Sequence, residues 1–278
     1  MMLRTRILVA GALLLLLIAM LMFGGVVRMV VFTAAALLSV YEMRKACAAK
    51  GYNPCVWPLY VFAALYYVWC GVGLTPIPGL MGYRVMAPHP LYLLAAFGGV
   101  ALCAERIFNA RRTTEDVICS LFIFIYPLAF YVTLMLVAEF SRAALLLLFA
   151  GPLMGDTLAY FVGTAFGKHK LCPHISPKKT VEGSVAGLFG GILGGYLTYV
   201  VQHMFLAGGA QISLVKLLLI GFLCGGLGQI GDLFASTFKR WAGIKDYGSI
   251  FPGHGGMMDR LDSVLMCAPV VYICLMWF

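Results

Sequence analysis

The chain has 278 residues, of which 62% are hydrophobic and only 11% are charged, whereas a soluble domain has roughly 45–50% apolar and about 25% charged residues. This composition excludes a soluble globular protein. The net charge of +9 would suggest a nucleic-acid partner in a soluble protein, but in a membrane protein it is typical of basic cytoplasmic loops, so we expect membrane lipids and no nucleic acid as partners.

Nine apolar segments follow one another along the chain. A membrane-spanning helix needs about 20 mostly apolar residues to cross roughly 30 Å of hydrocarbon. Segments of this kind lie at residues 7–24, 26–43, 57–73, 90–105, 117–138, 143–166, 184–206, 214–238 and 261–278. The sequence therefore predicts an all-α fold, a polytopic transmembrane helical bundle with about nine spans.

The distribution of Lys and Arg between the loops predicts the orientation, because positive residues collect on the cytoplasmic side of a membrane. With nine spans, sixteen of the twenty basic residues lie on one side. The other side receives only Arg28, Arg84, Arg142 and Lys216. We therefore predict a cytoplasmic N-terminus and an external C-terminus.

The two halves of the chain differ in the polar residues that their spans contain. Residues 1–140 keep their acidic side chains near the span ends, where they reach water, and we interpret this part as a transmembrane scaffold. Residues 141–278 carry carboxylates and many glycines inside the spans, and we predict a transmembrane catalytic domain there. Small residues let helices approach closely in lipid, so tight packing is the simplest interpretation of the glycines.

Two aspartates lie inside predicted spans. Asp156 is in the middle of the sixth span, and Asp232 lies about two turns before the eighth span ends near Lys239. A carboxylate at such a depth is costly unless it is paired, binds a metal or faces a watery cavity, so each is a functional candidate, with a structural ion pair as the alternative. Because positions i, i+4 and i+7 share a helix face, Asp232, Ser236 and Lys239 form one stripe, which suits a hydrated cation and an anionic oxygen.

A polar stretch, residues 239–263, separates the last two spans. Its charged residues and its histidine are Lys239, Arg240, Lys245, Asp246, His254, Asp259, Arg260 and Asp262. Carboxylates beside Lys, Arg and His suit Mg²⁺, which prefers hard oxygen ligands, and a polyphosphate, whose transfer requires mainly positioning and charge neutralisation. A solvated basic loop is the alternative, and it explains the cations but not the three aspartates.

Within this stretch, residues 251–256 contain one proline and three glycines. They predict a turn rather than a helix, and this turn directs His254 and the backbone N–H groups of Gly255 and Gly256 at a bound group. The two aspartates that follow are three residues apart at the start of the last span, so their side chains share one helix face.

These motifs resemble the signature of the phosphatidate cytidylyltransferase family, also called CDP-diacylglycerol synthase. The matching segments are residues 236–240, 245–248 and 251–262. A second stretch, residues 167–183, is similar to the cytoplasmic loop of bacterial members, and residues 156–160 resemble the segment that precedes it. The resemblance is strong over about residues 150–263 and only hydropathic before them.

The resemblance implies that CTP and phosphatidic acid react to give CDP-diacylglycerol and pyrophosphate, with Mg²⁺ as cofactor. It also implies a homodimer in the bacterial cell membrane, with the active site on the cytoplasmic side. Its two-cation centre is held by acidic residues at the positions of Asp232 and Asp259, and the second cation is either divalent or monovalent.

We expect the phosphate of phosphatidic acid to attack the α-phosphorus of CTP in line, so that pyrophosphate leaves. Metal binding is assigned to Asp156, Asp232, Asp259 and Asp262. Catalytic roles are assigned to Lys239, Arg240, Lys245 and Arg260, which offset charge on the triphosphate, to His254 as a ligand of a phosphate oxygen, and to Asp246 beside the cations. Substrate contacts are assigned to Ser236, Gly255, Gly256, Lys178 and Lys179, although the last two lysines equally fit an ordinary positive-inside loop.

The depth of these residues predicts a cavity that opens both to the cytosol, the source of CTP, and to the cytoplasmic leaflet, the source of phosphatidic acid. Two other functions stay open. A CTP-dependent lipid kinase would share the need for Mg²⁺ and a nucleotide, and a transporter would explain acidic residues and glycines inside the membrane.

Overall fold

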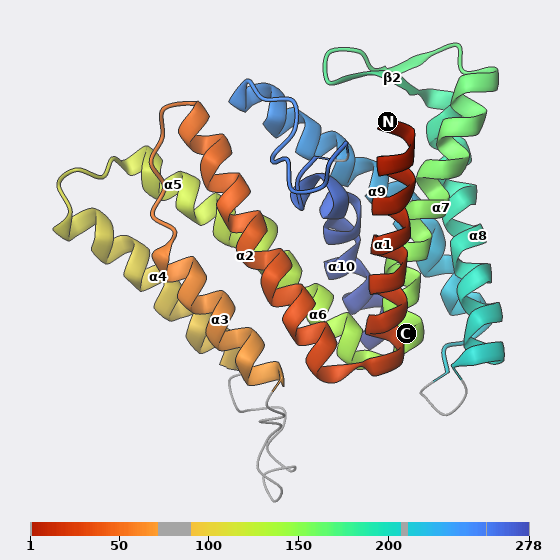
Figure 1. Cartoon of the computed structure of the whole chain (residues 1–278), viewed down its shortest axis with the longest axis horizontal. Coiled ribbons are helices and arrows are strands. Elements are labelled where there is room, and N and C mark those ends of the chain that lie inside the picture. The colour runs from red at the N-terminus through yellow and green to blue at the C-terminus, as the bar shows by residue number, and fades with distance from the viewer. Residues whose placement is uncertain (1, 72–89, 207–210, 254, 278) are drawn as a thin grey trace, which may run out of the picture. The chain divides into compact units, whose positions relative to one another are not determined.

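The computed structural model describes residues 2–71, 90–206, 211–253 and 255–277 (Figure 1). Its helices are α1 (Met2–Phe23), α2 (Gly25–Ala49), α3 (Trp57–Gly71), α4 (Pro90–Phe108), α5 (Thr114–Ile123), the π-helical segment η2 (Phe124–Ala129), α6 (Phe130–Phe140), α7 (Arg142–Phe166), α8 (Val181–Phe205), α9 (Leu214–Ala242) and α10 (Met258–Trp277). Two strands, β1 (Lys170–Cys172) and β2 (Ser176–Thr180), join α7 to α8.

Every predicted span falls on a helix, or on the run from α5 to α6, within the described residues. Six of these helices, with α5 to α6 taken as one, are long and apolar enough to cross a membrane, and α1 and α3 contain shorter apolar helices. The prediction of an all-α bundle with membrane-spanning helices is thereby confirmed. The number of nine spans and the cytoplasmic N-terminus stay predictions.

The chain forms two compact units. The N-terminal unit comprises residues 10–129, and the C-terminal unit comprises residues 130–278 together with residues 1–9. The assignment of residues 1–140 to a scaffold and of residues 141–278 to catalysis stays a prediction.

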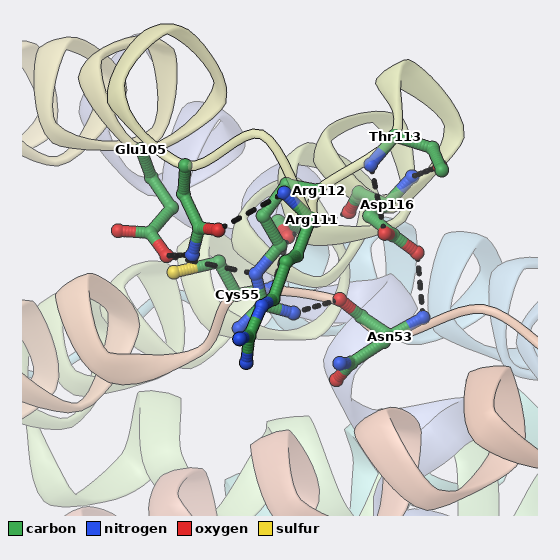
Figure 2. Close-up of polar contacts among 9 residues, drawn as sticks. Asn53, Cys55, Glu105, Arg111, Arg112, Thr113 and Asp116 are labelled. Atoms are coloured by element: carbon green, nitrogen blue, oxygen red, sulfur yellow. Dashed lines mark hydrogen bonds and ion pairs between the residues drawn. The ribbon is translucent and has the colours of Figure 1, made fainter.

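A polar junction in the N-terminal unit ties the loop after α2 to the start of α5 (Figure 2). Thr113 and Asp116 form a capping box at the start of α5, which satisfies backbone N–H groups that a helix leaves free. The carboxylate of Asp116 also accepts a hydrogen bond from the backbone N–H of Asn53 at 2.6 Å. Arg112 donates to the carbonyl of Asn53 and lies 3.5 Å from the carboxylate of Glu105. This junction is structural, because its charged groups bond one another and the backbone.

The predicted span at 117–138 is interrupted by η2. Pro127 lies within η2, and Tyr126 departs from helical geometry with φ of −126° and ψ of 110°. Proline has no N–H to donate and its ring clashes with the preceding turn, so the regular helix breaks there. The predicted span itself is confirmed, because Thr114–Phe140 is long and apolar enough to cross a membrane.

Glycines let α7, α8 and α9 pack closely in the C-terminal unit. A Cβ atom added to Gly155 would lie 3.1 Å from the Cα atom of Gly225 on α9 and 3.2 Å from the carbonyl oxygen of Gly187 on α8. A Cβ atom on Gly191 would overlap the carbonyl oxygen of Gly221. The predicted tight packing of these glycines is confirmed, and it brings the polar residues of three helices close together.

Candidate active site

The stretch between α7 and α8, which the sequence predicts only as a cytoplasmic loop, folds into a short β-hairpin. The strands β1 and β2 are antiparallel, with Lys170 opposite Thr180. The hydroxyl of Thr180 accepts a hydrogen bond from the backbone N–H of Gly183 at 3.2 Å, and this N-cap begins α8. In Figure 1 the hairpin extends beyond the ends of α7 and α8. It carries Lys178 and Lys179 on β2.

A cavity of about 670 Å³ lies between this hairpin and helices α7, α8 and α9. Its polar lining includes Asp156, Thr164, Lys170, Lys178, Lys179, Ser184, Gln229 and Asp232. Its apolar lining includes Ala159, Tyr160 and Leu171. The cavity thus joins four residues that the sequence singled out separately, namely both aspartates of the spans and both lysines of β2.

Lys179 and Asp232 form an ion pair across the cavity, with 2.7 Å between Nζ and Oδ2. The lysine comes from β2 and the aspartate from α9, so the pair links the hairpin to that helix. The two side chains are 22% and 37% exposed. Asp232 therefore has the ion-pair partner that the structural alternative predicts, and the pair also lines the cavity.

Gln229, one turn before Asp232, lines the cavity and joins α9 to α8. Its amide nitrogen donates to the carbonyl of Ser184 on α8 at 3.1 Å and to the carbonyl of Gly225 on its own helix at 2.8 Å. Gly187 leaves room for this amide, because a Cβ atom there would overlap it. Gln229 is not among the residues predicted from the sequence, although a polar side chain inside a span is the same signal that identified the aspartates.

Asp259 organises the segment between α9 and α10. Its Oδ1 lies 2.7 Å from Nζ of Lys239, and both side chains are almost fully buried. Its Oδ2 accepts hydrogen bonds from the backbone N–H groups of Tyr247 at 2.8 Å and Gly256 at 2.9 Å. The hydroxyl of Tyr247 donates to the carbonyl of Ala235 on α9 at 3.0 Å. The carboxylate therefore folds the segment back onto the end of α9.

The predicted turn at 251–256 is confirmed for its described residues. Phe251 and Gly255 form an isolated bridge, in which the N–H of Phe251 donates to the carbonyl of Gly255 at 3.0 Å. Gly255 has φ of +82°, which favours glycine, and a Cβ atom there would lie 2.8 Å from a carboxylate oxygen of Asp259. His254, the predicted phosphate ligand of this turn, lies outside the described residues.

The remaining predicted residues surround the same segment but do not line the cavity. Asp262 is buried, and its Oδ1 accepts a hydrogen bond from the backbone N–H of Ser263 at 2.7 Å. Ser236 is half-buried on α9. The exposed residues are Arg240, Lys245, Asp246 and Arg260. The predicted stripe on α9 is thus divided between two ion pairs, since Asp232 faces Lys179 and Lys239 faces Asp259.

The predicted metal ligands fall into two groups. Asp156 and Asp232 share the cavity, whereas Asp259 is engaged by Lys239 and by the backbone. Among the residues that the structure describes, no three His, Cys, Asp or Glu side chains form a group that could hold a metal ion by themselves. A cation in the cavity would therefore need oxygens from substrate or water as well, which is how Mg²⁺ is usually held in phosphate-handling sites.

Comparison with known proteins identifies the family to which the sequence is similar. The model of the cytidylyltransferase family matches residues 4–278. The phosphatidate cytidylyltransferase of Staphylococcus epidermidis is 47% identical over 120 residues, which is 43% of this chain and 44% of that protein. The enzyme of the same name from Aquifex aeolicus is 39% identical over 156 residues, or 55% of each chain, and that of Bacillus subtilis is 44% identical over 123 residues, or 44% of each. The chain thus spans about half the length of the curated relatives that it matches.

Proposed function

We propose, because the chain belongs to the cytidylyltransferase family, that it is an integral-membrane phosphatidate cytidylyltransferase, which makes CDP-diacylglycerol and pyrophosphate from CTP and phosphatidic acid. The observation that carries this proposal is the cavity in which Lys178 and Lys179 meet Asp156 and Asp232. Its volume lies within the range of roughly 300–1,000 Å³ that is typical of small-molecule sites.

The side chains around the cavity suit two phosphate-bearing substrates. Lys170, Lys178 and Lys179 place three ammonium groups where phosphate oxygens would lie. Tyr160 lines the cavity and is 67% exposed, and its neighbour Phe161 is 62% exposed on the same helix. The cavity therefore borders an apolar outer surface of α7, which supports access for a lipid whose tails stay in the membrane.

The proposed reaction is an in-line displacement at phosphorus. A phosphate oxygen of phosphatidic acid forms a bond to the α-phosphorus of CTP, and the bond from that phosphorus to the bridging oxygen breaks, so that the electron pair leaves with pyrophosphate. The attacking phosphate is already ionised, so no side chain has to act as a general base. The task of the lysines is to hold the two anions together and to offset their charge.

We also propose that the reaction depends on Mg²⁺, held in the cavity by Asp156 and Asp232 with phosphate oxygens of the substrate. When bound, such a cation offsets charge on the attacking and leaving oxygens. The two carboxylates fit this ion, because Mg²⁺ is commonly held by one or two carboxylates and substrate phosphates. Asp259 and Asp262 stay predicted metal ligands, and Asp259 would have to exchange Lys239 or a backbone N–H for a cation.

We also propose on which side of the membrane the reaction takes place. The hairpin lysines fit the cytoplasmic side under the positive-inside rule, and CTP is found on that side. We therefore place the active site at the cytoplasmic face of a bacterial cell membrane. The homodimer is proposed from the family resemblance alone.

The test is purified protein in detergent with radiolabelled CTP, phosphatidic acid and increasing Mg²⁺. Formation of labelled CDP-lipid together with pyrophosphate supports the proposal. Formation of CDP and a phosphorylated lipid would support a lipid kinase instead, and solute flux in vesicles without CTP turnover would support a transporter. Lys45→Ala, an exposed lysine of α2, serves as the control variant and should keep full activity.

A further inference from the structure

The hairpin that brings lysines to the cavity cannot hold its position by itself. Its strands have only three and five residues, and their register is interrupted between Lys170 and Cys172. A two-stranded hairpin is at best marginally stable without further packing. Contacts from outside the hairpin must therefore set where Lys178 and Lys179 lie.

Glu182, in the first turn of α8, supplies such contacts through both of its carboxylate oxygens. Oε2 accepts hydrogen bonds from the backbone N–H groups of Lys168 at 3.1 Å and His169 at 3.2 Å. Oε1 lies 2.6 Å from the ring nitrogen Nδ1 of His169. The backbone closes the same junction, because the N–H of Val181 donates to the carbonyl of His169 at 2.9 Å. Glu182 thus binds Lys168 and His169, the two residues that directly precede β1.

We propose that Glu182 is a positioning residue, which fixes the hairpin so that Lys178 and Lys179 face the phosphate groups of the substrates. This inference rests on the proposed function. Glu182 is not among the residues that line the cavity, so it acts through the hairpin and not on the substrate. The hairpin is then held at two places, by Glu182 at its base and by the ion pair of Lys179 with Asp232 at the cavity.

A carboxylate fits this position, because each of its oxygens can accept a hydrogen bond there. Three groups face Glu182, namely the backbone N–H groups of Lys168 and His169 and the ring nitrogen Nδ1 of His169. The two backbone groups are donors, and Nδ1 is a donor when it carries a proton, whereas a carboxylate has only acceptors. Glu182→Gln has nearly the same shape, but its NH₂ group would face an N–H group. Glu182→Asp keeps both oxygens on a side chain one methylene shorter, so it should restore part of the effect.

The first experiment measures the hairpin itself. Purified wild-type protein and variants are treated with trypsin in detergent, and cleavage after the hairpin lysines is followed by mass spectrometry. Because Glu182→Gln disturbs the hydrogen bonds that hold the residues before β1, it should speed this cleavage about 3-fold or more. Glu115→Gln removes an exposed carboxylate from the first turn of α5 and should leave the cleavage unchanged.

The second experiment measures kcat and the KM for each of the two substrates, CTP and phosphatidic acid. Mutation of the residues that orient metal ligands changes affinity or activity by roughly 10–100-fold. By analogy, Glu182→Gln should raise the KM for CTP or phosphatidic acid by about 10-fold while kcat falls less. His169→Ala removes only the ring contact and should have a smaller effect, about 2–10-fold. If Glu182→Gln does not fold, His169→Ala and Glu182→Asp carry both measurements.

The outcomes separate this inference from the proposed function. An active wild-type protein whose Glu182→Gln variant shows unchanged cleavage and unchanged KM would overturn the role of Glu182 and leave the function intact. A wild-type protein without cytidylyltransferase activity would overturn the proposed function. The cleavage experiment would still test whether Glu182 holds the hairpin in place. Faster hairpin cleavage together with a raised KM, partly restored in Glu182→Asp, supports the role.

Discussion

The most direct test of the cavity is Asp232→Asn, which keeps the size of the side chain and removes its charge. The effect on stability should be small, because the ion pair with Lys179 is partly exposed and such pairs contribute about 0.2–1 kcal/mol. The effect on turnover should be much larger. A bound cation contributes several kcal/mol at the transition state, and about 3–4 kcal/mol corresponds to a roughly 10²–10³-fold loss of kcat.

The assay compares wild type, Asp232→Asn and Lys179→Met in the same detergent, with initial rates over a range of Mg²⁺ and thermal unfolding of each protein. Lys179→Met breaks the same ion pair without removing a carboxylate. Its stability should therefore change by a similar amount, while its main kinetic effect should be a raised KM. Equal and modest losses of turnover in the two variants, each below about 10-fold, would mean that the pair is structural and that Asp232 holds no cation.

Three further predictions concern the C-terminal unit, and two of them test its packing while the third tests the proposed cation. Asp259→Asn should lower the free energy of unfolding by about 3 kcal/mol, because it leaves the buried Lys239 without its charged partner. Chemical unfolding measures this free energy. An unchanged midpoint would contradict the packing described for the segment between α9 and α10. Gly191→Ala should cost about 1–3 kcal/mol because its Cβ atom meets the carbonyl of Gly221, whereas Gly99→Ala, with nothing within 4 Å, should be neutral or slightly stabilising in the same unfolding experiment. Removal of divalent ions with EDTA should abolish turnover, and added Mg²⁺ should restore it. Added Mg²⁺ should also raise the unfolding temperature of wild type but not that of Asp232→Asn. Full activity in EDTA would exclude the proposed cation.

The helices could be predicted from the sequence because their signal is local. A run of about 20 apolar residues has few alternatives to a helix in a membrane, since every backbone polar group must be satisfied within the segment. The carboxylates Asp156 and Asp232 could be identified for the same reason, because a charge inside such a run is costly. Their shared cavity could not be derived from spacing, since it depends on how α7 and α9 pack.

The parts that the sequence did not predict depend on contacts between distant residues. The hairpin has only short strands, and its stability comes from Glu182, Thr180 and the ion pair of Lys179 with Asp232. Lys239 appeared to belong to the stripe with Asp232, yet it faces Asp259, twenty residues later in the chain. Helix periodicity gives the face on which a side chain lies, and only the packing decides which partner meets it there.

The charges around the cavity explain why a cation is expected there at all. Three lysines and two aspartates leave one formal positive charge in the lining. A nucleoside triphosphate and a phosphate headgroup together bring several negative charges, which this single charge cannot balance at close range. Without a cation, the negative charges of Asp156 and Asp232 would repel the phosphate groups of both substrates. If Asp156 and Asp232 hold Mg²⁺ as proposed, the cation would make both aspartates part of an anion-binding site. The pairing of Lys179 with Asp232 keeps the carboxylate compensated within the wall of the cavity, and it places an ammonium group beside the position where a substrate phosphate would meet that cation.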